Sequence, residues 1–290
     1  MNKAVYDSSI IASASKTSKS QNQDSSAEFE ENDLKAIFIA DGLGSFKYPK
    51  LASERVVEFL REKILMQSLK NTKLIYSQLE ETFYQAKQDL VSFAKKNITE
   101  SEKKEQLLFG TTVIALFEIG NKILIAYVGN GAIWHVRGNF TDFSNSYHFP
   151  WNAINYLNPH TTPEQGKEAL YRLISDNPHF DECRPTVLEI EKDPECGDIF
   201  MICTDGIYSA DQLKTGKNDK GIWVRYEPSM LKYFEHLKAF FKSRQMYGKE
   251  NLEKMLDAYL EELKPKLDDD ATIGVLITKE ALTYQTRLIG

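Results

Sequence analysis

Three aspartates stand at the ends of apolar segments, where carboxylates could gather. Asp41 and Asp205 each follow an apolar run that predicts a strand, and Asp269 precedes another. The ends of strands in one fold can meet in space although they are far apart in sequence. Carboxylate oxygens are ligands that hard cations such as Mg²⁺ and Mn²⁺ prefer, and without a cation clustered carboxylates would raise each other's pKa. These residues therefore predict a divalent-cation site.

The turn Asp41-Gly42-Leu43-Gly44-Ser45 sets the character of this site. Its two glycines allow the backbone to approach a ligand closely. Taken alone, the turn favours a plain strand-turn-helix corner in which Asp41 caps the helix. Asp205-Gly206 repeats the arrangement at another strand end, which favours a shared site instead. Two cations ~3.5–4 Å apart can share a bridging carboxylate and activate water for in-line attack on phosphorus.

The hydrophobic pattern predicts the elements that position these residues. We expect amphipathic helices, with apolar residues at helical spacing on one face, at residues 51–66, 73–97, 230–241 and 251–263. We also expect a short helix at residues 163–175. We expect strands at residues 4–14, 33–40, 110–119, 122–129, 132–138, 186–191, 198–204, 273–277 and 282–288. Residues 16–31, with a turn at Asn22-Gln23-Asp24, are polar and predict an exposed loop. Residues 208–226 predict an exposed loop or flap.

Pairing of the strands follows from the turns between them. Gly120-Asn121 is a hairpin signal between residues 110–119 and 122–129, and residues 132–138 are expected as the third strand of this meander. We also expect residues 186–191 and 198–204 to pair antiparallel. The pattern contains neither repeats nor a low-complexity linker, so residues 1–290 are expected to form one domain, with an insertion at residues 208–263.

Composition excludes several classes of protein. The net charge of −6 over 290 residues argues against a nucleic-acid-binding protein, which would be basic. The three cysteines are odd in number and lack metal-ligand spacing, which predicts reduced thiols in the cytoplasm. The N-terminal apolar run is too short for a signal peptide, and no segment has the ~20 apolar residues of a membrane span. We expect a cytoplasmic protein without a membrane or nucleic-acid partner.

Six short segments follow one another along the chain: Lys19-Ser20-Gln21-Asn22-Gln23-Asp24, Asp41-Gly42-Leu43-Gly44, Gly110-Thr111-Thr112, Val128-Gly129-Asn130-Gly131, Thr204-Asp205-Gly206 and Asp269-Asp270-Ala271-Thr272. In this order they resemble the motifs of the metal-dependent serine/threonine phosphatases of the protein phosphatase 2C family, in particular its bacterial type. The resemblance covers nearly the whole chain. It implies an α+β fold, a four-layer α-β-β-α sandwich in which two antiparallel β-sheets are flanked by helices.

The resemblance also implies a role for each site residue. Asp41 would bridge two Mn²⁺ or Mg²⁺ ions, with the Gly42 carbonyl on one of them. Asp205 and Asp269 would hold the other, although Asp268 or Asp270 would replace Asp269 after a small shift of register. Asp24 would orient metal-bound water, and outer ligands of this kind tune the metal. The implied catalytic residues are thus Asp41, Asp24 and Asp205, with Lys19 at the substrate phosphate.

Three positions depart from the family pattern. Lys19 replaces the usual Arg and lacks its two-pronged grip on phosphate; a solvated loop lysine explains it equally well. Asn130 replaces an Asp that helps to bind a third metal, so a third ion is doubtful. Leu43 stands where eukaryotic members carry a His, which leaves the general acid open. None of the five histidines lies in a motif, and His135 is expected to be packed or exposed rather than catalytic.

These residues predict a Mg²⁺/Mn²⁺-dependent phosphatase that hydrolyses protein phosphoserine and phosphothreonine by a metal-bridging hydroxide, with a role in signalling. The implied partners are a phosphorylated protein and a cognate Ser/Thr kinase. Because Lys19 and Asn130 depart from the family pattern, a second hypothesis is a catalytically silent member of the family that binds phosphoproteins or other partners. A third is a phosphatase of a small phosphorylated metabolite or nucleotide.

Overall fold

A computed structural model describes residues 6–17, 19–31, 34–68, 74–99, 107–139, 152–164, 167–180, 182–209, 214–217, 221–226, 228–243 and 247–289. The chain divides into two compact units. Unit A comprises Lys19–Gly131 and Asn158–Glu191, and unit B comprises Met1–Ser18, Ala132–Leu157 and Lys192–Gly290. Within the described residues, no helix combines the length and apolar character that a membrane span requires.

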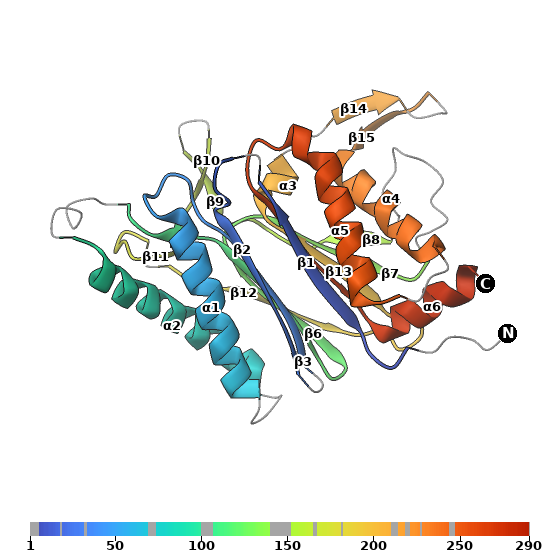
Figure 1. Cartoon of the computed structure of the whole chain (residues 1–290), viewed down its shortest axis with the longest axis horizontal. Coiled ribbons are helices and arrows are strands. Elements are labelled where there is room, and N and C mark those ends of the chain that lie inside the picture. The colour runs from blue at the N-terminus through green and yellow to red at the C-terminus, as the bar shows by residue number, and fades with distance from the viewer. Residues whose placement is uncertain are drawn as a thin grey trace. The chain divides into compact units, whose positions relative to one another are not determined.

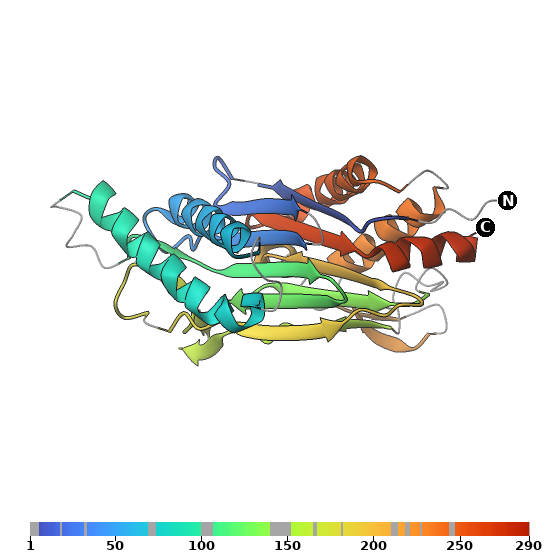
Figure 2. The same cartoon turned by 90° about the horizontal axis from the view of Figure 1, so that it is seen from below.

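Unit A is built on a five-stranded antiparallel sheet in the order β12-β6-β5-β3-β2. Its strands are β12 (Thr186–Glu191), β6 (Lys122–Val128), β5 (Val113–Ile119), β3 (Leu34–Asp41) and β2 (Asp24–Glu31). Helices α1 (Pro49–Ser68) and α2 (Leu74–Asn97) cover one face of this sheet (Figures 1 and 2). Their buried apolar stripes, which include Leu60 and Phe83, pack on Phe38 and Phe117, as the helical periodicity predicts.

Two short antiparallel pairs complete unit A. Strand β4 (Gly110–Thr111) pairs with β11 (Ile174–Ser175). Strand β9 (Thr161–Glu164) pairs with β10 (Lys167–Leu170). These strands correct the helix predicted at residues 163–175. Residues 167–170 pair with residues 161–164 in a local hairpin, and residues 174–175 pair with the distant β4. Hydrogen bonds between strands therefore outweigh the local helix propensity.

Unit B is built on a second five-stranded antiparallel sheet, in the order β1-β16-β13-β7-β8. Its strands are β1 (Ile10–Lys16), β16 (Ala271–Ile277), β13 (Asp198–Cys203), β7 (Ala132–Arg137) and β8 (Ala153–Asn155). Helices α4 (Pro228–Lys242) and α5 (Lys249–Leu263) bury their apolar stripes against one face of it. The short helix α3 (Asp205–Ser209) follows β13, and the 3₁₀ turn η2 (Lys264–Lys266) follows α5.

The segment predicted as a flap forms a two-stranded ribbon in its described part. Strand β14 (Lys214–Lys217) pairs antiparallel with β15 (Trp223–Tyr226). Residues 210–213 and 218–220 lie outside the described residues. Trp223 is 68% exposed and Ile222 is 57% exposed, so the ribbon carries large apolar side chains in contact with solvent.

Strand β2 corrects the prediction of a loop at residues 16–31. Its composition is polar, but Ala27 and Phe29 pack against the core of unit A while Ser26 and Glu30 are exposed. This is the alternation of a strand with one buried face. Because β2 is an edge strand that pairs only with β3 in this sheet, it needs few apolar residues.

Helix α6 (Lys279–Ile289) corrects the strand predicted at residues 282–288. Ala281, Leu282 and Gln285 are buried, which is helical rather than alternating spacing. The start of α6 packs on Gly197, where a Cβ atom would come within 2.0 Å of the Ala281 nitrogen. The absence of a side chain at Gly197 therefore leaves room for the first turn of the helix.

Two predicted pairings are also wrong, although the strands themselves form. β7 is not the third strand of a meander, because it joins the sheet of unit B. Gly129 (φ +108°) and Gly131 (φ +124°) let the chain change direction before β7. Likewise β12 and β13 do not pair with each other, since β12 pairs with β6 and β13 lies between β16 and β7.

Candidate active site

The structure brings Asp24 and Asp41 together at one end of the unit A sheet. Asp24 begins β2, Asp41 ends β3, and the two residues lie directly opposite each other in the antiparallel ladder. Side chains of such a pair project from the same face of the sheet. Asp24 is 6% exposed, and Asp41 is partly exposed. Two adjacent carboxylates repel unless a proton or a cation lies with them.

The backbone of Asp41 is held by the two threonines of the Gly-Thr-Thr segment. The Thr112 N–H donates to the Asp41 carbonyl at 2.9 Å, and the Thr111 hydroxyl donates to the same carbonyl at 2.7 Å. The Asp41 N–H donates to Thr112 Oγ1 at 3.3 Å. Both threonines are buried, at 0% and 2% exposed. These bonds fix the strand end from which the Asp41 carboxylate projects.

Gly42 continues this arrangement through an isolated bridge to Thr111. The two bonds of the bridge use the carbonyls of Asp41 and Gly110, so the Gly42 carbonyl is not an acceptor in it. A Cβ atom on Gly42 would lie 2.2 Å from the Pro49 carbonyl oxygen and 2.9 Å from that of Gln23. Only glycine fits this crowded turn, which explains the residue type that the sequence motif carries.

The entry to β2 is fixed from two directions. Asn22 Oδ1 accepts the Asp24 N–H at 3.0 Å, which confirms the predicted turn at residues 22–24. Ser53 of α1, 0% exposed, donates through its hydroxyl to the Gln23 carbonyl at 2.6 Å. Lys19 lies in the segment before this turn and is exposed.

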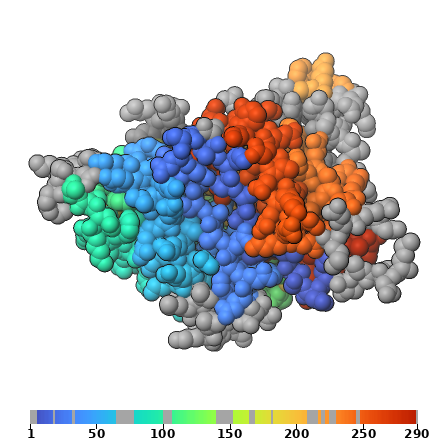
Figure 3. All heavy atoms as spheres, viewed as in Figure 1, coloured from blue at the N-terminus to red at the C-terminus, as the bar shows by residue number. Residues whose placement is uncertain are grey.

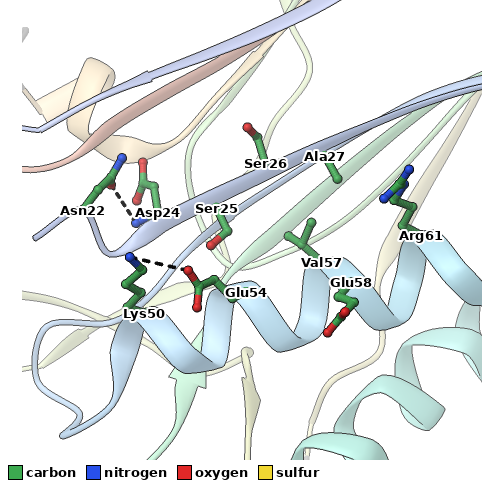
Figure 4. Close-up of a pocket in the computed structure, with 10 residues that line it drawn as sticks. All are labelled: Asn22, Asp24, Ser25, Ser26, Ala27, Lys50, Glu54, Val57, Glu58 and Arg61. Atoms are coloured by element: carbon green, nitrogen blue, oxygen red, sulfur yellow. Dashed lines mark hydrogen bonds and ion pairs between the residues drawn. The ribbon is translucent and has the colours of Figure 1, made fainter.

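A groove of about 640 Å³ opens between β2 and α1 and begins at Asn22 and Asp24. Figure 4 shows that Asp24 and Ser26 project away from α1, whereas Ser25 points toward it. Both elements reach the surface of unit A (Figure 3). The groove carries charges of both signs, which are contributed by Lys50, Glu54, Glu58 and Arg61 of α1. Because residues 16–31 were predicted to form a loop, nothing in the sequence indicated this groove beside β2.

In unit B, the strand ends that carry Asp205 and Asp269 lie next to each other. The Thr204 N–H donates to the Thr272 carbonyl at 3.0 Å, and the Thr272 N–H donates to Thr204 Oγ1 at 2.9 Å. Asp205 follows directly as the first residue of α3, and Asp269 lies just before β16. The two motifs predicted to act together are therefore adjacent in this unit.

Gly206 is the contact between these two motifs. A Cβ atom there would lie 1.8 Å from the Asp270 carbonyl oxygen, so the glycine is required for the close approach. Of the three consecutive aspartates, Asp268 is exposed, Asp269 is partly exposed and Asp270 is 2% exposed. The Asp270 N–H donates to Asp269 Oδ1 at 2.8 Å.

The donor atoms suit a hard cation, because each unit offers carboxylate oxygens beside a glycine turn. Across the described ranges, no three or more His, Cys, Asp or Glu side chains gather as a metal-binding group. Asp24 with Asp41 and Asp205 with Asp269 are therefore two separately described pairs. Their oxygen chemistry fits Mg²⁺ or Mn²⁺ better than it fits a soft metal.

The sequence left open whether His135 is packed or exposed, and the structure shows that it is packed in unit B. It is 5% exposed, bonds through Nε2 to Asp198 Oδ1 at 2.7 Å and stacks on Phe200. Burial alone would raise the pKa of Asp198, but hydrogen bonds from His135, from the Asp193 N–H and from Arg137 outweigh burial and lower it. Asp198 begins β13, whereas Asp205 follows its other end.

His160 is a residue that sequence reasoning missed. It contacts the Val128–Gly131 motif through hydrogen bonds to Gly129. Its segment, Asn158-Pro159-His160, has no spacing that points to a site. Because the contact joins residues 31 positions apart, no local signal could have found it.

Comparisons with known proteins define the class. The family model described as protein phosphatase 2C matches residues 13–260, a range that ends before Asp269. No curated protein matches the chain in sequence. The chain belongs to the protein phosphatase 2C family, because the model matches most of its length.

Solved structures resemble the chain in fold. A serine/threonine phosphatase from S. agalactiae has a TM-score of 0.63 at 14% identity, over 92% of this chain and 99% of that chain. The M. tuberculosis serine/threonine phosphatase PstP/Ppp has a TM-score of 0.57 at 15% identity, over 93% and 99%. A C. elegans sex determining protein has a TM-score of 0.67 at 11% identity, over 98% and 68%. The predicted α+β class, with two antiparallel sheets flanked by helices, is confirmed.

Proposed function

We propose that this protein is a Mg²⁺- or Mn²⁺-dependent phosphatase that hydrolyses phosphoserine and phosphothreonine in proteins. The observation that carries the proposal is the pairing of Asp24 with Asp41 directly beside the crowded Gly42 turn. Membership of the protein phosphatase 2C family supports the reaction class. The likeness to bacterial serine/threonine phosphatases supports the choice of substrate, although it reaches only 13–15% identity.

In this proposal, the cation ligands would be Asp41 and the Gly42 carbonyl in unit A, and Asp205 and Asp269 in unit B. The bound cations would supply Lewis-acid stabilisation of the phosphoryl oxygens and lower the pKa of water. The threonine bonds to the Asp41 backbone hold the strand end from which its carboxylate projects. Asp24, opposite Asp41, accepts a hydrogen bond from water and orients it.

Substrate binding falls to groups near Asp24. Lys19 supplies a positive charge for the phosphate without the two-pronged geometry of Arg. Leu43 has no proton to donate, so protonation of the leaving group falls to water or to another side chain. Asn130 is neutral and disfavours a third cation.

The partners follow from this reaction. The substrate is a phosphorylated protein, and a Ser/Thr kinase would supply it. Cys183, Cys196 and Cys203 are free thiols, which suits a reducing compartment, so we place the protein in the cytoplasm.

A phosphothreonine peptide assay tests the proposal. Phosphate release with Mn²⁺ should stop when a chelator is added, and Asp205→Asn should lower kcat by about 100-fold or more, because it removes a ligand of the cation that stabilises charge. Asp257→Asn, at an exposed aspartate of α5, is the matched control and should retain activity. Equal rates with and without metal, or full activity of Asp205→Asn, would refute the proposal.

Calorimetry separates the enzyme from a silent binding module. The phosphatase should bind Mn²⁺, and Asp41→Asn should lose most of that binding. A chain that binds no Mn²⁺ but does bind a phosphopeptide would be the module that Lys19 and Asn130 suggest. Preference for a small phosphorylated metabolite over phosphopeptides would instead overturn the choice of substrate.

A further inference from the structure

The segment Asn158–His160 is tied to the end of β6 by two reciprocal pairs of hydrogen bonds. The Tyr127 hydroxyl donates to the Asn158 carbonyl at 3.1 Å and accepts the Asn158 N–H at 3.1 Å. Two residues further along both segments, the His160 N–H donates to the Gly129 carbonyl at 2.9 Å. The Gly129 N–H in turn donates to His160 Nδ1 at 3.1 Å. One residue thus bonds both backbone groups of Gly129.

These contacts define the protonation state of His160. Because Nδ1 accepts the Gly129 N–H, it carries no proton, so the proton of the neutral ring is on Nε2. Nε2 lies 2.9 Å from Thr186 Oγ1 and can donate to it, whereas Arg172 Nη1, which can only donate, lies further from Nε2 at 3.4 Å. The ring is 4% exposed and stacks on Tyr127, with centroids 5.1 Å apart. Burial and the nearby Arg172 guanidinium lower the pKa of His160 to about 4, so the ring is neutral near pH 7.

Gly129 joins His160 to the strand end that carries Asp41. With φ at +108°, Gly129 lies so close to Thr112 that a Cβ atom would be 2.5 Å from Thr112 Cγ2. The methyl side of Thr112 therefore packs on the Gly129 backbone. The hydroxyl of the same side chain accepts the Asp41 N–H at 3.3 Å, and the Thr112 N–H donates to the Asp41 carbonyl at 2.9 Å.

We propose that His160 is a positioning residue of this phosphatase: its neutral imidazole holds the Gly129–Asn130 turn against Thr112, and Thr112 fixes the backbone of Asp41. The inference rests on the proposed function, because it assigns His160 to the reaction of Asp41. His160 touches neither substrate nor cation in this role. It acts through a chain of contacts that lies wholly within unit A.

Two substitutions of His160 separate the clamp from simple packing. His160→Asn places an amide oxygen near the position of Nδ1 and can still accept the Gly129 N–H. His160→Gln places its amide near the position of Nε2, so it can keep the contact with Thr186 but not the clamp. Both variants are neutral and polar. Urea unfolding of each, compared with the parent, establishes that the chain is folded before activity is measured.

The clamp makes different predictions for the two variants. In His160→Gln, exchange of the Gly129 amide proton should quicken by about 10-fold or more as its hydrogen bond is lost. Its kcat on the phosphothreonine peptide should fall by about 10- to 100-fold, the usual loss for a group that orients a ligand, with little change in KM. His160→Asn should stay within about 3-fold of the parent in both measurements.

Three results would overturn the inference. The first is Gly129 amide exchange and kcat in His160→Gln that equal those of the parent. The second is an equal loss of kcat in both variants. The third is a ¹⁵N chemical shift that places the ring proton of the parent on Nδ1. An inactive parent refutes the proposed function separately. Amide exchange and the ¹⁵N shift need no turnover, so they would still show whether His160 holds Gly129.

Discussion

Gly42 and Gly44 lie two residues apart in one turn, yet their surroundings differ. A Cβ atom on Gly42 would lie 2.2 Å from the Pro49 carbonyl oxygen, which is rigid backbone. A Cβ atom on Gly44 would meet only the end of the Gln23 side chain, at 3.4 Å. The first glycine is thus a structural requirement of the Asp41 corner, and the second is not required by sterics.

Gly42→Ala should therefore lower the free energy of unfolding by about 1–3 kcal/mol, the usual cost of overpacking. Gly44→Ala is the matched control and should change it by less than about 0.5 kcal/mol. Urea unfolding followed by circular dichroism measures both. Equal values for the two variants would contradict the crowding of Gly42.

The buried ring of His160 should make stability depend on pH. Burial and Arg172 lower its pKa in the folded state to about 4, whereas an unfolded chain has an ordinary histidine pKa of about 6.5. Between these values the unfolded chain binds a proton that the folded protein does not. Stability from this group is therefore complete above about pH 6.5 and declines as the pH falls toward 4.

The urea midpoint of the parent should decrease as the pH is lowered from 7.5 to 5. The midpoint of His160→Asn should decrease less, because this variant has no imidazole at that position. Burial and Lys232 also lower the pKa of His236, which contributes in the same window, so the difference between parent and variant is the informative quantity. Identical pH dependence in both proteins would show that His160 is not the titrating group.

At the scale of elements, α1 does more than cover the sheet. Ser53 on its buried face bonds the Gln23 carbonyl and the Ser25 hydroxyl, so the helix fixes the start of β2. Arg55 on α1 binds both carboxylate oxygens of Asp89 on α2, at 2.6 and 2.8 Å. The helix pair and the edge strand thereby position Asp24 together.

The β14–β15 ribbon is the element that we expect to select protein substrates. Its Trp223 is 68% exposed, and the Lys217 ammonium lies 5.4 Å from the ring centroid. An exposed aromatic side chain of this kind suits contact with a polypeptide. An ordinary surface hairpin would leave the choice of substrate unchanged.

Trp223→Ala should lower kcat/KM on a phosphothreonine peptide by about 10-fold, the effect of losing roughly 1.4 kcal/mol of contact. Hydrolysis of a small aryl phosphate should be unchanged, because that substrate is too short to reach beyond the phosphate site. Equal losses on both substrates, or none on either, would show that the ribbon does not select substrates.

At the scale of the whole molecule, cation binding should increase the free energy of unfolding. A ligand that binds only the folded state at 100 times its Kd adds about 2.7 kcal/mol. Mn²⁺ should therefore raise the urea midpoint of the parent, whereas it should not raise the midpoint of Asp205→Asn. A chelator supplies the metal-free baseline. The same increase in parent and variant would place the bound Mn²⁺ elsewhere.

The sequence by itself determined the features that depend on neighbouring residues. The apolar stripes of α1, α2, α4 and α5 follow helical spacing, and the Gly120 hairpin follows its turn. Asp41 and Asp205 were found because each follows an apolar run and precedes a glycine. These are local properties, so a single sequence shows them.

Tertiary structure decided the features in which distant segments supply the stabilising contacts. β2 is a strand despite its polar composition, because Ala27 and Phe29 pack on the core of unit A, and the first turn of α6 packs on Gly197. No local pattern specifies which sheets β7 and β12 join. His160 matters through hydrogen bonds to Gly129 that join distant parts of the chain. Hydrogen bonds and packing between residues far apart in sequence are set by the fold as a whole.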